Sequence, residues 1–323
     1  MGKMTELSSK WRVSELTDGD VPEICELFRQ VFGTDLSPEH WNWKYVNGSG
    51  VGMVVRDDKN QIAAYYGGVE RRILDQGRPA LTLQCCDTMV AESQRGTLSK
   101  KGPYFLAATS LLEAYVGFNR PYLFGFGFPN KRVMRLGEHL GVQASIGNVV
   151  QIEWESAGQN ELAGEVFDIN NPEHGLLIDL FWQELSASMH HKIITVRDKA
   201  YIQYRFLDHP FYDYQLVIVR DLDKAVGLLV FRIENQRLLV LDTIASPNNF
   251  SRIMNYSRDI AQKMELRGVY GWVTEADINL FADDEMTITD IDVRIPTSIC
   301  TDGPTVVELM NKWYLTAGDT DFL

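Results

Sequence analysis

Hydrophobic residues in the N-terminal half of the chain change repeatedly between helical and strand-like spacing. The segment 21–32 predicts an amphipathic helix, because its apolar residues fall on one helical face. These residues are Val21, Ile24, Leu27, Phe28 and Val31. Asp20 and Glu23 are spaced as in a capping box, and Pro22 suits a first helical turn. The pattern therefore places the start of a helix next to residue 20.

The rest of this half predicts a fixed order of elements. Strands are expected at 11–16, 53–58, 62–74, 80–90 and 122–128, and helices at 37–46, 105–116 and 130–141. From the N-terminus the order is strand, two helices, three strands, helix, strand, helix. That order predicts an α/β fold, an α+β mixed sheet with helices on both faces.

Two segments of the C-terminal half repeat patterns of the N-terminal half. Residues 204–224 resemble residues 43–59: each has an aromatic–basic–aromatic triplet, a loop, an apolar strand, and then Arg-Asp and Lys. The sequence DTIA at 242–245 likewise echoes DTMV at 87–90. Two matches in the same order predict tandem copies of one domain type. Two domains are therefore expected, at 1–155 and 166–323, on either side of the polar, glycine-containing segment 156–166.

The composition argues against several classes of protein. The 323 residues are 45% hydrophobic, which is ordinary for a globular protein and excludes disorder and fibres. The formal net charge of −13 argues against a nucleic-acid partner, although not against a small phosphorylated ligand. No apolar run is long enough to predict a membrane span, and the first residues do not resemble a signal peptide. The oligomeric state stays open.

The cysteine and histidine spacing predicts no metal site. None of the four cysteines stands in C-x-x-C spacing, which favours reduced thiols and a cytoplasmic protein. The adjacent pair His190 and His191 has no carboxylate or cysteine partner at ligand spacing. We therefore expect no bound metal.

The segment 87–110 is the most informative candidate for chemistry. An expected strand runs into a basic, glycine-containing loop and then into an expected helix. Free N–H groups and the dipole at the start of that helix favour an anion such as phosphate or pyrophosphate. Gly102 allows close approach of the backbone, and Pro103 suits the first helical position. A solvated loop with incidental basic residues is the alternative.

The run from Cys85 to Gly141 resembles the GNAT superfamily of acyl-CoA-dependent N-acyltransferases. It has the strand CCDTMV, a basic loop and a helix, followed by YLFGFGFPNKRVMRLGEHLGV, whose FPN…R-x-G-x-x-LG pattern is typical of one branch of that superfamily. The resemblance covers residues 11–150. The second half resembles the family only as a degenerate copy, in which SPNNFSRI replaces the phosphate loop. The resemblance implies tandem GNAT-like domains with the cofactor site in the first.

The resemblance also implies which residues contact coenzyme A, the expected co-substrate in its acyl form. They are Met89, Val90, Arg95, Gly96, Lys100, Lys101, Gly102, Tyr104, Asn130 and Arg132. Asn130 most simply caps the following helix, so a CoA contact there is what the resemblance adds. For Arg132 a solvated helix face is the alternative.

The chain departs from the family pattern at two places. The loop starting at Gln94 lacks the second glycine of the family motif, and the run from Lys100 to Phe105 fits the end of that motif better. Many members place a tyrosine seven residues after the asparagine, to protonate the leaving thiolate, but here that position is Gly137. Gly125 and Gly127 share one face of the expected fifth strand, where either a pantetheine arm or a tightly packed helix would need the space.

Acyl transfer from a thioester requires a neutral amine, a polarised carbonyl and a stabilised thiolate. Family members polarise the carbonyl with a backbone N–H of the fourth strand, which falls at 88–90 here, and the amine attacks directly. Asp87 is the candidate catalytic base, although its echo Asp242 also suggests a structural duty. Cys85 and Cys86 face opposite ways on a strand and are interpreted as core residues.

The expected acceptor is the primary amine of an amino sugar, linked to a nucleotide, as in precursors of surface polysaccharides. Tandem proteins with the FPN signature resemble enzymes of that kind, and Trp41, Tyr65 and Tyr66 are candidates for substrate binding. The second domain would shape the acceptor pocket. A Fem-type aminoacyl transferase is one alternative, although its tRNA binding fits poorly with the acidic charge. A non-catalytic acyl-CoA-binding module is another.

Overall fold

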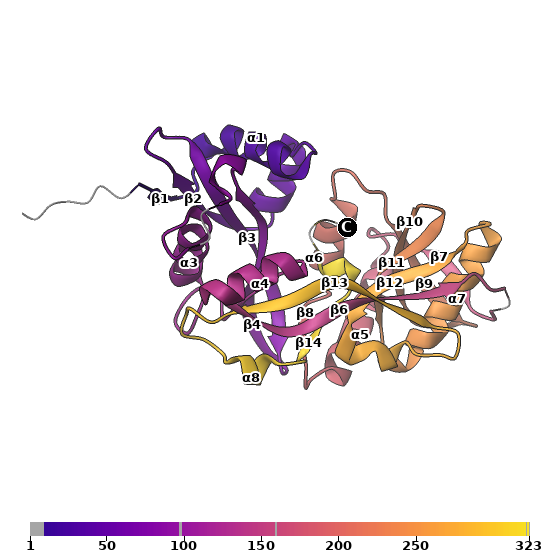
Figure 1. The fold of residues 1–323 in the computed structure, drawn as a ribbon. Coiled ribbons are helices and arrows are strands. Elements are labelled where there is room, and N and C mark those ends of the chain that lie inside the picture. Colours follow the sequence, from indigo (N-terminus) through magenta and orange to yellow (C-terminus); the bar gives the residue numbers. More distant parts are fainter. Residues whose placement is uncertain (1–9, 97–98, 159, 321, 323) are drawn as a thin grey trace, which may run out of the picture.

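The computed structural model describes residues 10–96, 99–158, 160–320 and 322, which form two lobes (Figure 1). Each lobe is built on a mixed sheet, and both sheets contain seven strands within the described residues. Helices cover the sheets, so the predicted α/β class is confirmed. No helix in the described part of the chain combines the length and the apolar character needed to cross a bilayer.

The first sheet has the strand order β1-β2-β3-β4-β5, and β8 and β14 extend it beside β3. Its strands are β1 (Arg12–Glu15), β2 (Gly50–Arg56), β3 (Ile62–Asp75), β4 (Arg78–Val90), β5 (Gly125–Phe126), β8 (Ile193–Thr195) and β14 (Trp313–Tyr314). Strands β1 to β4 are antiparallel neighbours, whereas β5 runs parallel to β4. The sheet therefore changes direction at the β4–β5 pair.

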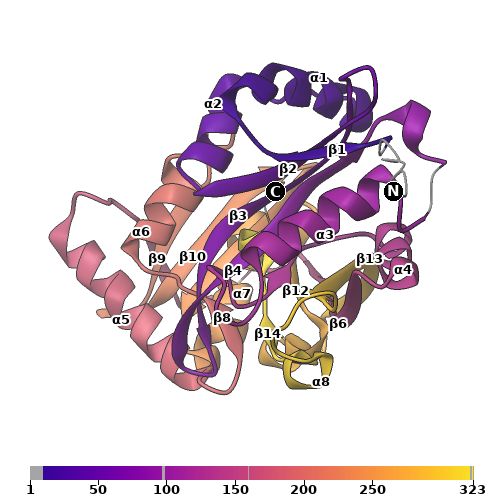
Figure 2. The same cartoon turned by 90° about the vertical axis from the view of Figure 1, so that its left-hand side faces the viewer.

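Two layers of helices cover the first sheet, as Figure 2 shows. Helix α1 (Val21–Phe32) and the short α2 (Pro38–Trp41) lie on one face, where Ile24 and Leu27 of α1 pack against Val54 and Tyr65. Helix α1 has the predicted bounds and ends at Gly33, whose φ of 76° suits a glycine. Helix α3 (Pro103–Tyr115) covers the other face. Helix α4 (Lys131–Leu140) follows β5 and ends at Gly141.

The strand predicted at 122–128 is much shorter in the structure. Only Gly125 and Phe126 pair with β4, and Tyr122 forms an isolated bridge with Val116. Tyr122 packs in the core beside α3, whereas Phe124 and Phe126 pack against Trp313, so Tyr122 does not share a face with these two aromatic residues as it would in a regular strand. Without a continuous ladder, the side chains of this segment do not keep a strict alternation.

The second sheet has the order β13-β6-β12-β11-β10-β9-β7. Its strands are β6 (Gln143–Glu155), β7 (Ala163–Val166), β9 (Gln215–Asp221), β10 (Lys224–Glu234), β11 (Arg237–Ala245), β12 (Gly268–Thr274) and β13 (Thr287–Ser298). The remaining helices are α5 (Pro172–Ser188), α6 (Lys199–Ile202), α7 (Phe250–Lys263) and α8 (Val306–Leu309). Neighbouring strands are antiparallel except β11 and β12, which run parallel.

The two halves share one succession of elements. A short helix leads into one π-helical turn, at 42–46 and again at 203–207, and three antiparallel strands follow. A 3-10 turn, a helix and a parallel strand complete each copy. The halves also exchange strands, because β8 and β14 join the first sheet although they lie late in the chain.

Candidate active site

The parallel strands β4 and β5 separate after only two residue pairs. Leu83 pairs with Gly125 and Gln84 with Phe126, and beyond these pairs the strands diverge. A cavity of about 440 Å³ lies where they part. It is lined by β4, by the segment after β5, by α1 and α3, and by Pro296 and Phe322 from the second half.

Side chains from both faces of the first sheet line the cavity. Tyr66 and Tyr104, whose rings lie 6.3 Å apart, line it on the side of α3. Phe28 and Phe32 of α1 line it on the opposite side, with their own rings 4.6 Å apart. Aromatic side chains from both faces of the sheet therefore meet at this cavity.

A bulge in β4 turns Asp87 toward the side of α1 and α2. The register of β3 and β4 shifts between Tyr65 and Gly67, and Asp87 has a φ of 48°, in the left-handed region. Its carboxylate accepts hydrogen bonds from Lys44 Nζ at 2.8 Å and from Tyr45 Oη at 2.7 Å. The Lys44 and Asp87 side chains are only 4% and 8% exposed. Asp87 therefore lines the cavity as a carboxylate that forms an ion pair with Lys44 and accepts a hydrogen bond from Tyr45.

The loop after β4 leads directly into the N-terminus of α3. Gly102 is the residue before the helix, and its carbonyl accepts the bond from Leu106 N. The N–H groups of Tyr104 and Phe105 precede this first helical bond and so have no acceptor within the helix. Lys100 and Lys101 are exposed beside them. A helix start with adjacent cations is suited to an anion.

The matching separation in the second sheet is filled by the chain's own tail. Strands β11 and β12 make three parallel pairs, and Val273 of β12 then bridges to Thr316. A Cβ on Gly318 would lie 3.1 Å from Leu241 O of β11, so the tail packs tightly there. The first half keeps a cavity of about 440 Å³ at this position, whereas the cavity at the matching position of the second half has only about 10 Å³.

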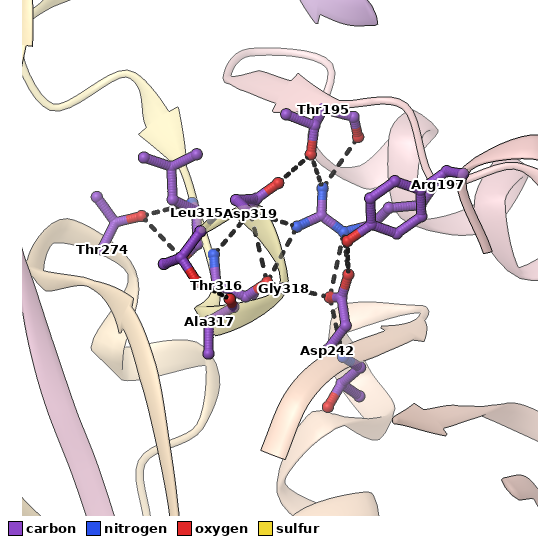
Figure 3. Close-up of polar contacts among 12 residues, drawn as sticks. Thr195, Arg197, Asp242, Thr274, Leu315, Thr316, Ala317, Gly318 and Asp319 are labelled. Carbon is purple, nitrogen blue, oxygen red and sulfur yellow. Dashed lines mark hydrogen bonds and ion pairs between the residues drawn. The ribbon is translucent and has the colours of Figure 1, made fainter. Parts of the chain in front are cut away.

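A buried network fixes the tail in that place (Figure 3). Arg197, which is fully buried, donates to Asp242 at 2.9 Å and to Asp319 at 2.7 Å. Thr195 and Thr316 bond to the same carboxylates. Burial raises the pKa of Asp242, and the two carboxylates raise that of Arg197 against its own burial. The network leaves no room for a second ligand between β11 and β12.

Solved structures with a similar fold include acyltransferases. A probable N-acyltransferase from Enterococcus faecalis shares 11% identity with this chain at a TM-score of 0.68, over 93% of this chain and 74% of that one. The chain has the GNAT fold. N-myristoyltransferase from Saccharomyces cerevisiae, solved with myristoyl-CoA and inhibitors, gives a TM-score of 0.56 at 9% identity, over 100% and 89% of the two chains.

A third structure with the GNAT fold comes from a larger enzyme. The glucosamine N-acetyltransferase region of a fungal multi-domain β-N-acetylglucosaminidase gives a TM-score of 0.59 at 13% identity, over 90% of this chain and 38% of that one. No protein-family model matches the sequence, and no curated protein matches it. At these identities the likeness shows the fold alone.

Of the residues expected to hold CoA, Tyr104 and Asn130 line this cavity, and the others lie outside its lining at different depths. Met89 is buried in the core beside α1, and Val90 is half-buried at the end of β4. Arg95 is exposed and donates to Val90 O at 3.1 Å, and Gly96 is exposed as well. The loop motif also includes Thr97 and Leu98, which lie outside the described residues.

The segment after β5 confirms the predicted helix cap. Asn130 Oδ1 accepts from Val133 N at 3.0 Å, and Asn130 also lines the cavity. Arg132 is exposed on the first turn of α4. A Cβ on Gly137 would lie 2.5 Å from the side chain of Gln143, so this position is occupied by packing. The site therefore has no proton donor at the tyrosine position of the family.

The two glycines around β5 are explained by contacts within the protein. A Cβ on Gly127 would lie 2.8 Å from Cys85 O, so the backbone of β4 is the close neighbour there. A Cβ on Gly125 would meet Cys85 Sγ and Leu112 of α3 at 3.4 Å. Close packing of strand and helix accounts for both positions.

The three aromatic residues expected to bind substrate are placed differently. Tyr66 lines the cavity on the side of α3. Trp41 stacks on Tyr45 in the core, with ring centroids 4.3 Å apart, and Tyr65 is fully buried beside it. Trp41 and Tyr65 are therefore behind the wall that carries Asp87.

The adjacent cysteines face opposite sides of β4, as predicted. Cys85 packs in the core beside α3, and Cys86 in the core beside α1. Burial raises the pKa of the Cys85 thiol to about 12. A protonated thiol is a poor nucleophile, which agrees with a structural interpretation of the pair.

Several residues that line the cavity or bind its wall were not identified from the sequence. Lys44 and Tyr45 belong to the triplet that marked the repeat, but its pattern did not show that they bind Asp87. Phe28 was assigned to a helix face without a role. Phe322 reaches the cavity only because residues 316–319 are fixed in the second sheet, 74 or more positions from Asp242. Long-range contacts of this kind leave no local pattern.

Proposed function

We propose that this protein is an N-acyltransferase that moves an acyl group from acyl-CoA to a primary amine. The observation that carries the proposal is the open cavity between β4 and β5, beside the free N–H groups of α3, in a chain whose second copy is closed. Among the structures that share this fold, yeast N-myristoyltransferase was solved with bound myristoyl-CoA. The fold, the anion-binding helix start and the cavity support the same cofactor.

The diphosphate of CoA would lie at the start of α3. The backbone N–H groups of Tyr104 and Phe105 supply neutral donors, and Lys100 and Lys101 supply charge. Arg95, Gly96 and Gly102 shape the loop, while Asn130 borders the cavity and Arg132 is exposed on the first turn of α4. The pantetheine arm would then enter between the diverging strands and present its thioester to the backbone of 88–90.

The transfer would proceed by direct attack of the amine on the thioester carbonyl. The amide C–N bond forms, the C–S bond breaks, and CoA leaves as a thiolate that takes a proton from solvent. The bulge in β4 leaves a backbone group without its ladder partner, and an N–H there can polarise the carbonyl. Asp87 would accept the proton that the amine loses. Each carboxylate oxygen has a bond from Lys44 or Tyr45, and an ionised carboxylate can accept further bonds. The raised pKa of Cys85 argues against an acyl-cysteine intermediate.

The acceptor would be an amino sugar linked to a nucleotide, as in surface polysaccharide precursors. Phe28, Phe32 and Tyr66 offer aromatic faces on which a sugar ring can pack. The second half, assigned to 166–323, contributes Pro296 and Phe322 to the cavity wall, which supports a role in shaping the acceptor site. One structure of the same fold is a glucosamine N-acetyltransferase region.

A coupled assay tests the proposal directly. Purified protein is incubated with acetyl-CoA or longer acyl-CoAs and an amino-sugar nucleotide, and release of free thiol and the amide product are measured. We expect an amide product with at least one acyl-CoA. Binding of CoA without product from a panel of amines would favour the non-catalytic acyl-CoA-binding module. Absence of CoA binding would contradict both.

A further inference from the structure

A second cavity, of about 250 Å³, lies at the junction of the two halves. It is bordered by residues 47–49, by β3 at 70–72, by α6 and the turn after it, and by Gly318 and Asp319 of the tail. It shares no lining residue with the cavity between β4 and β5. Neither the expected CoA contacts nor the expected base lies in it.

Two hydrogen-bond donors at this cavity are not fully used. Arg71 donates from Nε to Gln84 and from Nη1 to the carbonyl of Glu70, while its Nη2 has no partner among the described residues. The hydroxyl of Tyr204 is buried and likewise has no partner in the part of the chain that the structure describes. The Arg71 guanidinium lies 5.9 Å from the centre of the Tyr204 ring. A ligand oxygen between them would satisfy both donors.

The charges around the cavity favour an anion over a neutral group. Asp319 is held by Arg197, and Arg72 by Asp198, so these charges are already compensated. Glu70 also lines the cavity, and it neighbours Arg71 along a strand, where successive side chains point to opposite faces. Arg71 forms no ion pair with any carboxylate among the described residues. The chain has a net charge of −13, so the Arg71 guanidinium, which is not ion-paired within the described residues, provides a local site that attracts an oxyanion.

The second cavity lies within reach of the first. Asp319 borders one and Phe322 borders the other, and three residues of extended chain span at most about 11 Å. Gln84 holds this geometry, because it accepts from Arg71 Nε and donates to Asp319 O at 3.0 Å. The separation of the two cavities is therefore within the length of one elongated molecule.

We propose that the cavity at Arg71 and Tyr204 binds a phosphate or carboxylate group, and that this group belongs to the acceptor. The assignment to the acceptor rests on the proposed acyl transfer, whereas the anion site does not. The acceptor lies with its negative charge at Arg71 and its amine beside Asp87. A nucleotide-linked sugar has such a phosphate, and a simple amine does not.

Calorimetric titration with inorganic phosphate tests the anion site in the full chain. We expect saturable binding that weakens at least about tenfold in Arg71→Met and about tenfold in Tyr204→Phe, since each removes a bond to a charged group. Arg252→Met, in an exposed pair with Asp221, removes a charge elsewhere and should change the affinity less than twofold. Lys100→Met, at the expected CoA loop, identifies any separate binding of phosphate at the start of α3. Tyr204→Phe decides the question if Arg71→Met does not fold.

Two results would overturn the anion site: no saturable binding of phosphate, or binding that depends on Lys100 and not on Arg71 and Tyr204. Kinetics then test the link to the acceptor. Phosphate should compete with the acceptor in the unmodified protein and lose this competition in Arg71→Met, and a lack of competition with the acceptor would overturn that link. Phosphate binding that depends on Arg71 in a protein without CoA binding would refute the acyl transfer and leave the anion site standing.

Discussion

Trp43 of the first half lies flat against Tyr204 of the second, with ring centroids 5.2 Å apart and an interplanar angle of 10°. The indole N–H of Trp43 also donates to Tyr204 O at 2.8 Å. The two residues occupy the same place in the repeated triplets, WKY and YRF, within the two π-helical turns. The halves therefore meet through corresponding positions, as copies related by an approximate two-fold axis do.

Replacing Trp43 should destabilise the junction of the two halves. Trp43→Ala removes a buried ring and its hydrogen bond, and we expect a loss of about 3–5 kcal/mol in the free energy of unfolding. Urea denaturation followed by circular dichroism measures this loss. The control is Phe211→Ala. Phe211 is exposed and contacts His40, which also contacts Trp43, and removing its ring should cost under about 1 kcal/mol in the free energy of unfolding. Equal effects of the two variants would contradict a junction centred on Trp43.

The Arg197 network should be essential for a folded second half. Arg197→Met leaves Asp242 and Asp319 buried without their counter-charge, so we expect a loss of about 3–5 kcal/mol in stability. Adding Asp242→Asn to Arg197→Met removes one of the stranded charges and should recover part of that loss. Thermal or urea unfolding of the two single variants and the double variant gives the coupling energy. If the stability changes of the two single variants add up to that of the double variant, Arg197 and Asp242 do not stabilise the fold cooperatively.

Asp87→Asn tests the proton acceptor at nearly constant structure. Asparagine tolerates the left-handed backbone at this position, so the bulge should persist. If Asp87 accepts the amine proton, kcat should fall by about 10²- to 10⁴-fold while the affinity for CoA stays the same. Steady-state kinetics and calorimetry with CoA measure the two quantities. A loss of kcat below about threefold would assign Asp87 a structural role, as for Asp242.

Cys85 should react slowly with iodoacetamide although it borders a cavity. With a pKa of about 12, its thiolate fraction at pH 8 is roughly a thousandth of that of an ordinary thiol. Because burial raises this pKa, the rate should keep increasing about tenfold per pH unit past pH 9, where an ordinary thiol levels off. Mass spectrometry of labelled peptides measures the rate of Cys85 alkylation, with urea-unfolded protein as the reference. Equal rates in folded and unfolded protein would refute the raised pKa.

The sequence predicted elements whose formation is decided locally. The helix at 21–32 has its apolar face and its cap within one segment, and the structure has it at those residues. The segment 122–128 was wrongly extended, because its alternation of aromatic residues and glycines is caused by packing against β4 and Trp313. The length of this strand depends on its pairing with residues far away in the sequence, and the local sequence pattern does not show that pairing.

The candidate site was predictable only in part for the same reason. The loop before α3 is recognisable from consecutive residues, so Lys100, Lys101 and Gly102 could be identified from the sequence as one candidate anion site. The Lys44–Asp87 pair joins residues 43 positions apart, and Thr316 reaches Asp242 over 74 positions. Contacts across such separations follow from the fold, and they were visible only once the two sheets were in place.

A crystal structure of the protein with CoA tests the central claim most directly. The account predicts the diphosphate at the start of α3, within hydrogen-bond distance of the backbone N–H groups of Tyr104 and Phe105. It also predicts the pantetheine arm between β4 and β5, with its sulfur toward Asp87. A diphosphate bound beside β11 and α7, or no bound CoA at saturating concentration, would contradict it.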